Sequence, residues 1–160
     1  MDSLFPGLAA TLDLHPLFVH FPIAFWLAAA VLFPLGWLRD RLWCAEVGRL
    51  LLWLGTAAAL VAAWTGYLAS ERMGHDAPGH DFVHVHRNYM LAAIAVAVVA
   101  SGLAWKIREH RGSGAALVAG LSIVIALLTG LGADRGALLV FGYGVGSLDS
   151  APAPPAEHQH

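Results

Sequence analysis

The chain has 160 residues, of which 58% are hydrophobic and 12% charged, whereas a typical soluble domain carries about 25% charged residues. Its mean hydropathy of +0.65 leaves too little polar surface for a water-soluble globule. The net charge of −2, without a basic run, excludes an electrostatic nucleic-acid interface. Because Cys44 is the single cysteine, an intramolecular disulfide and a cysteine-based zinc or iron–sulfur centre are excluded as well.

Four apolar runs follow one another along the chain, each close to the roughly 20 residues that cross a bilayer core. They cover residues 17–38, 50–69, 89–107 and 115–132. The first contains Pro22 and Pro34, which we expect to kink it or to set its ends. The third is apolar on all sides, and Ala93, Ala97 and Ser101 give it a stripe of small residues for close helix packing. These runs predict an all-α polytopic membrane protein with a four-transmembrane-helix bundle.

The predicted membrane domain covers residues 1–147 and ends in a glycine-rich segment, while the Pro- and Ala-rich tail 148–160 is expected to be disordered. A secretory signal requires basic residues before its apolar core, and no Lys or Arg precedes the first run. We therefore expect this run to remain as a membrane anchor. The first and third loops hold most of the basic residues, namely Arg39, Arg41, Arg49, Lys106, Arg108 and Arg111. Because basic loops stay in the cytoplasm, we predict a bacterial inner (cytoplasmic) membrane protein with both termini outside (N-out and C-out).

Nine histidines are many for so apolar a chain, and most of them lie at the predicted outer face. These are His15, His20, His75, His80, His84 and His86. His20 lies within the apolar stretch FVHFPIAFW, where an ionisable group is costly and indicates a functional site. His86 lies at the mouth of the third helix. Two such imidazoles can ligate a haem iron or another metal ion, or they can simply bond to backbone or water and tie the helix ends together.

The leading hypothesis is an electron-transfer subunit that holds a b-type haem near the outer membrane face. His20 and His86 are the expected axial ligands, with His15 or His84 as alternative members of the pair. Arg87 is placed to pair with a haem propionate.

The second hypothesis is a non-redox membrane module without haem. It binds copper or zinc through His75, His80 and His84, or serves as an accessory subunit of a larger complex. A protein without any cofactor is also compatible with the sequence. Paired carboxylates, HExxH and a nucleophile elbow are all missing from the sequence, so we expect a carrier or accessory subunit rather than an enzyme by itself.

Three motifs together resemble the bacterial membrane-protein family known as domain of unknown function 2231. They are HPLFVHFPIAFW from His15, HRN from His86 and GADRGALLVFGYGVGS from Gly132, and the similarity runs from about Leu14 to Ser147. The family typically ends in a Leu-Val-Tyr-like triplet and a His-Gly-Val-Gly motif, where this chain has Phe141 and Tyr143. Some relatives look to be fused to Rieske iron–sulfur domains. The resemblance therefore implies a four-helix membrane protein with a redox role. Its expected partner is a quinone or an iron–sulfur or cytochrome protein, and both a homo-oligomer and a hetero-oligomer are compatible with it.

The glycine-rich segment, residues 130–146, contains an adjacent Asp134–Arg135 pair that can be buried. Glycines allow tight turns and close backbone approach. This segment is expected either to cap a cofactor pocket near the histidines or to form a surface hairpin.

Overall fold

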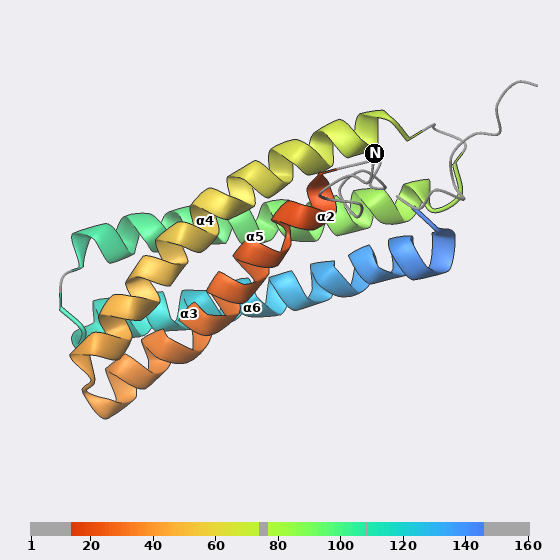
Figure 1. Cartoon of the computed structure of the whole chain (residues 1–160). Helices are drawn as coiled ribbons and strands as arrows, with labels where there is room; N and C mark the ends of the chain where they lie inside the picture. Colours follow the sequence, from red (N-terminus) through yellow and green to blue (C-terminus); the bar gives the residue numbers. More distant parts are fainter. Residues whose placement is uncertain (1–13, 74–76, 108, 146–160) are drawn as a thin grey trace, which may run out of the picture.

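The computed structural model describes residues 14–73, 77–107 and 109–145, and over these ranges it consists of helices (Figure 1). In chain order they are α2 (His15–Phe18), α3 (His20–Arg39), α4 (Leu42–Glu71), α5 (His80–Lys106), α6 (Gly112–Ala137) and the π-helical turn η1 (Leu138–Gly142). Taken with their short extensions, they give four candidate membrane spans in the described part of the chain, and each is long and apolar enough to cross a bilayer. The prediction of an all-α, four-span membrane protein is confirmed.

The helices are longer than the apolar runs that predict them. The second run has the length of a bilayer core, yet α4 extends over 30 residues. Similarly, α5 begins at His80, nine positions before the third run. Hydropathy marks only the part of a helix that lies in hydrocarbon, whereas backbone hydrogen bonding continues into the polar ends. The histidine-containing start of α5 is therefore helical.

The glycine-rich segment is also helical where the structure describes it. Its residues continue α6 to Ala137 and then form η1, so the expected surface hairpin is wrong. The apolar residues from Leu138 to Phe141 favour a buried or lipid-facing helix here over a solvated turn. Tyr143 follows η1 and packs on Phe82 at the start of α5, with ring centroids 5.4 Å apart. This contact joins the last described residues to the second hairpin.

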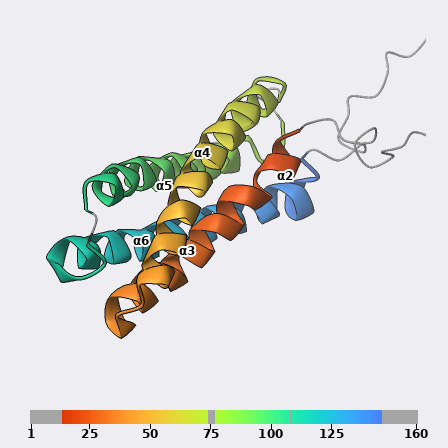
Figure 2. The same ribbon diagram turned by 60° about the vertical axis from the view of Figure 1, so that its left-hand side comes forward.

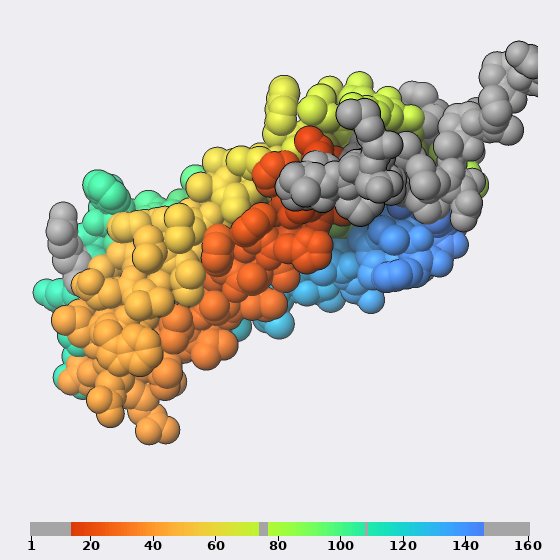
Figure 3. Space-filling model, viewed as in Figure 1, coloured from red at the N-terminus to blue at the C-terminus, as the bar shows by residue number. Residues whose placement is uncertain are grey.

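The helices form two antiparallel hairpins, α3–α4 and α5–α6, which also contact each other through α3 with α6 and α4 with α5. The hairpins lie at an angle to one another (Figure 2). In the space-filling view, α3 and α4 cover most of the near face, with α6 along its lower edge (Figure 3). Most outward-facing side chains along the spans are large and apolar, as expected for a surface in contact with lipid.

The turn between α3 and α4 is very tight. Asp40 adopts a left-handed conformation with φ of 53°, and the backbone N–H groups of Asp40 and Arg41 both donate to the carbonyl of Gly36. A Cβ atom on Gly36 would lie only 2.7 Å from the backbone nitrogen of Ala45. The two helices therefore touch backbone to backbone at this end.

Farther along the hairpin, glycines of α4 accept aromatic rings from α3. Phe33 packs on Gly48, and Trp26 packs on Gly55, where an added Cβ would lie 2.6 Å from the indole ring. Both aromatic side chains are buried. Because lipid gives helices little hydrophobic reason to associate, such close packing is a main source of stability. Seven residues separate these two contacts on each helix, and the next such contact, 11 residues farther along each helix, involves a histidine.

Small residues also line the α5 side of the core. Ala93, Ala97, Ala100 and Ala104 are all buried, so two of the three small residues of the predicted stripe face the interior, and Ala100 and Ala104 continue it in place of Ser101. Ser101 lies beside it, and its hydroxyl contacts that of Thr56 on α4 at 3.1 Å. In the same region the indole N–H of Trp53 donates to the Ser101 carbonyl at 3.2 Å. These bonds join α4 to α5 within the apolar part of the bundle.

Candidate functional site

Four of the predicted site histidines gather at one end of the bundle. His15 begins α2, while His80, His84 and His86 lie in the first two turns of α5. Because the helices alternate in direction, α4 ends there and η1 lies there too (Figure 1). His75 and the tail residues 148–160 lie outside the described residues, so their predicted roles stay predictions.

His15 is fixed by the end of α4. Its Nδ1 lies 2.9 Å from the carbonyl oxygen of Ala62 and 3.3 Å from the hydroxyl oxygen of Thr65. A carbonyl can only accept, so Nδ1 must carry the proton and donate. The ring lies directly over Gly66, where a Cβ atom would be 2.8 Å from Cε1. Gly66 thus accepts the His15 ring in the way that Gly55 accepts Trp26.

His86 is fixed in the same manner by α6. Its Nδ1 lies 2.7 Å from the carbonyl oxygen of Gly132, so this nitrogen also donates its proton. One turn further along α6, a Cβ atom on Gly136 would be 3.2 Å from Cε1 of the ring. Gly136 thus gives the imidazole a place on α6 without a side chain, whereas a Cβ atom on Gly132 would meet Met90 and Tyr89 instead.

The two fixed rings face each other across the end of the bundle. Their centroids are 6.4 Å apart and their planes are nearly perpendicular, at 82°. Because Nδ1 is the donor in both rings, Nε2 is the nitrogen of each ring that remains for a metal ion. Histidines that ligate metals commonly show this arrangement, in which the second ring nitrogen donates to a carbonyl and holds the ligand in place. Side chains and carbonyls from α2, α4, α5 and α6 all contribute to the His15–His86 pair.

The structure does not bring His20 to His86. The His20 side chain is exposed on α3, and no contact between these two described residues is present. His15 and His20 are five residues apart, which turns the second ring about 140° around a helix relative to the first. A short break at Val19 also separates α2 from α3, because Pro22 has no N–H to donate to the carbonyl four residues before it. The geometry thus favours His15, the alternative member of the predicted pair.

His80 and His84 form a second pair on α5. Their Nε2 atoms are 3.1 Å apart, as expected for residues four apart on one helix face. Two steps along a helix turn the chain by about 200°, which is about 160° the shorter way round, so His84 and His86 point to nearly opposite sides of α5. His84 therefore belongs with His80 and not with His86. Within the described ranges, no group of three or more His, Cys, Asp or Glu side chains is placed to hold a metal ion.

The other charged candidates lie at the surface. Arg87 is exposed next to His86. Asp134 and Arg135 do form an ion pair, at 3.4 Å, but the aspartate side chain is 72% exposed, so the pair is not buried.

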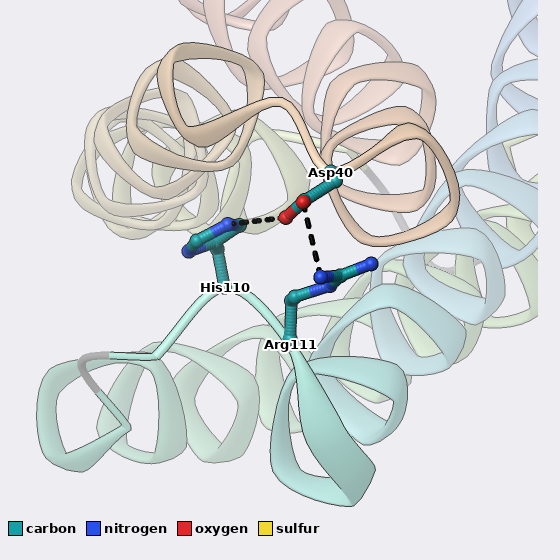
Figure 4. Close-up of polar contacts among 3 residues, drawn as sticks. All are labelled: Asp40, His110 and Arg111. Carbon is teal, nitrogen blue, oxygen red and sulfur yellow. Dashed lines mark hydrogen bonds and ion pairs between the residues drawn. The ribbon is translucent and has the colours of Figure 1, made fainter.

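The opposite end of the bundle holds an ion cluster that joins the first and third loops. Asp40 accepts from Nε2 of His110 at 2.9 Å through one carboxylate oxygen and pairs with Arg111 at 3.0 Å through the other (Figure 4). The three side chains are partly exposed. Sequence reasoning missed this cluster, because 70 residues separate Asp40 from His110 and no motif links them. It also missed Thr65, Gly66 and Gly136 as the supports of the imidazoles, although their small size was a usable signal.

Fold and site together define a polytopic membrane protein whose four-helix bundle holds a fixed pair of histidines at one end. The chain belongs to the family described as predicted membrane protein (DUF2231), whose model matches residues 11–149. The similarity noted from the motifs is thereby confirmed at the level of the family.

The relatives are mycobacterial. The chain is 38% identical over 112 residues to the uncharacterized protein ML1222 of Mycobacterium leprae, covering 68% of this chain and 54% of that one. It is 35% identical over 120 residues to the uncharacterized protein Rv1591 of Mycobacterium tuberculosis, covering 70% and 58% respectively. The chain thus spans little more than half the length of these relatives. No solved structure matches it.

Proposed function

We propose that this protein is a membrane electron-transfer subunit that holds one haem b between His15 and His86. The observation that carries the proposal is the pair itself, in which each Nδ1–H is bonded to a backbone carbonyl of a neighbouring helix. This bonding fixes both rings in the tautomer that ligates iron through Nε2. The proposed haem site therefore uses His15, in place of His20, as its first ligand.

The separation of the rings supports a single metal ion between them. A histidine–metal bond is about 2.0 to 2.1 Å long, and a ring nitrogen lies about 1.1 Å from the centre of its ring. Two imidazoles that held one ion between them would have centroids at most about 6.3 Å apart, close to the 6.4 Å observed. A haem bound there supplies reversible one-electron transfer, with its potential set by bis-His ligation and by the low dielectric of the surroundings.

The residues around the pair suit such a group. Gly66 and Gly136 let the backbones of α4 and α6 approach the two imidazoles closely, which holds both rings in place for a ligand. Arg87, exposed beside His86, is available to pair with a propionate. We expect the redox partner, a quinone or an iron–sulfur or cytochrome protein, to approach this end of the bundle.

The distribution of basic residues supports an orientation. Among the basic residues that the structure describes, five lie in or next to the two loops at the Asp40 end, namely Arg39, Arg41, Arg49, Lys106 and Arg111, against three at the histidine end. By the positive-inside rule, we place the Asp40 end in the cytoplasm and the histidine pair at the outer face of a bacterial cytoplasmic membrane.

The test is a visible spectrum of the full chain purified in detergent from haem-replete cells. We expect a Soret band that shifts on reduction with dithionite. His15→Ala and His86→Ala should each lose it, whereas His20→Ala, which changes an exposed histidine at the same end, should keep it. A colourless preparation would refute haem binding. Loss of the band in His20→Ala alone would return the first ligand to His20.

A further inference from the structure

The second histidine pair, His80 and His84, lies in the first two turns of α5 and takes no part in the proposed haem site. Both side chains are half-buried, and their rings are close, with centroids 4.8 Å apart and planes at 79°. The 3.1 Å contact joins the two Nε2 atoms. Two nitrogens whose lone pairs both suit a metal ion are thus already adjacent.

Their separation matches that of two ligands on one ion. With metal–nitrogen bonds of about 2.05 Å, nitrogens at a right angle, as in tetragonal copper(II), are about 2.9 Å apart. Nitrogens at the tetrahedral angle of zinc are about 3.3 Å apart. The observed 3.1 Å falls between these values. An ion can therefore bind both Nε2 atoms near their present separation, once the two rings rotate to aim both lone pairs at it, and with no movement of the helix.

The sequence spacing gives the same result. Two histidines four residues apart on a helix face are the arrangement that chelates zinc in HExxH sites. Here the pair has the sequence HDFVH and lacks the glutamate that serves as general base in those enzymes, so the spacing suits binding and not hydrolysis. The pair also lies on the face of α5 opposite His86, so occupation of one site does not require the other.

We propose that His80 and His84 form a binding site for a divalent transition-metal ion of the copper–zinc class, separate from the His15–His86 pair. Imidazole is a suitable ligand for both ions, and copper(II) is expected to bind more tightly than zinc. In the metal-free protein one Nε2–H bonds to the other Nε2. On binding, the first ring moves its proton to Nδ1, and both Nε2 lone pairs face the ion.

The experiment is a titration of the full chain in detergent with copper(II) and, separately, zinc(II), followed by calorimetry. His158→Gln and His160→Gln are introduced into every protein, so that the tail histidines do not contribute. His80→Gln and His84→Gln should each weaken binding at least tenfold, because each removes half of the chelate. His20→Gln, a matched change of an exposed histidine, should bind like the parent.

Electron paramagnetic resonance of the copper(II) form provides the second readout. The parent and His20→Gln should show hyperfine coupling to two equivalent nitrogens, and the single-histidine variants should not. Unchanged affinity in both His80→Gln and His84→Gln overturns the proposal, as does a two-nitrogen signal that persists in them. Circular dichroism before titration confirms that each variant keeps its helices. The proposal does not depend on haem binding, because the titration measures only the binding of the copper or zinc ion.

Discussion

Gly36→Ala provides a direct test of how closely α3 and α4 approach. The new methyl group would lie 2.7 Å from the backbone nitrogen of Ala45, about 0.7 Å short of the 3.4 Å at which ordinary contact begins. A backbone atom cannot rotate away as a side chain can, so the helices must separate. Such overpacking costs about 1–3 kcal/mol, and replacing a helical glycine by alanine returns up to about 1 kcal/mol. We expect a net destabilisation of about 1–2 kcal/mol.

The native chain contains the probe for this measurement. Cys44 is the single cysteine and its side chain is 1% exposed, next to Ala45, so a thiol-reactive fluorophore labels it only when the bundle opens. At about 2–4 °C per kcal/mol for a chain of this size, Gly36→Ala should melt about 2–8 °C below the parent. Gly120→Ala is the matched control, because nothing lies within 4 Å of its added Cβ. A Gly36→Ala protein that melts at or above the parent temperature would refute the close contact.

Three further predictions follow from other features. Asp40→Asn keeps a residue that tolerates the left-handed conformation but removes the carboxylate charge that pairs with Arg111 in the third loop. Because this pair is partly exposed, the free energy of unfolding should fall by about 1 kcal/mol or less, and a deficit that persists in 1 M NaCl would contradict the electrostatic explanation. Thr56→Val removes the hydroxyl contact with Ser101 and should cost about 0.6–1.7 kcal/mol in a chemical-denaturation series in mixed micelles; no loss would show that the contact is not formed. Alkaline phosphatase fused after residue 145 should be active and a green fluorescent protein there dark, and the reverse would overturn the N-out, C-out orientation.

The sequence was sufficient for the fold at the level of spans. In hydrocarbon, a backbone must satisfy its own hydrogen bonds, so each long apolar run with few charges has to be a helix. Gly130 and the residues that follow it were harder, because glycine-rich sequence fits a turn as well as a packed helix. The run of apolar residues from Leu138 to Phe141 was the better guide, and it continues the fourth span.

The histidine pair was only half predictable. Chain position places His15, His20 and His86 at the same membrane face, but which ring points inward depends on the helical register. It depends also on the partner helix, which supplies Gly66 as the surface for His15. A periodicity argument on one helix cannot contain this information. The Asp40 cluster was invisible for a related reason, since it exists only once the first and third loops are brought together.

In the described part of the chain, side chains donate to main-chain carbonyls of other segments in at least four places: His15 to Ala62, His86 to Gly132, Trp53 to Ser101 and Arg49 to Ile107. The acceptor oxygen belongs to the peptide unit, so any residue of suitable size at the acceptor position offers it equally well. Natural selection can therefore hold the donor constant while the acceptor position drifts. Among related sequences, these four bonds should leave no correlated pairs of substitutions, and contact inference from covariation should recover the helix packing around them without detecting the bonds themselves.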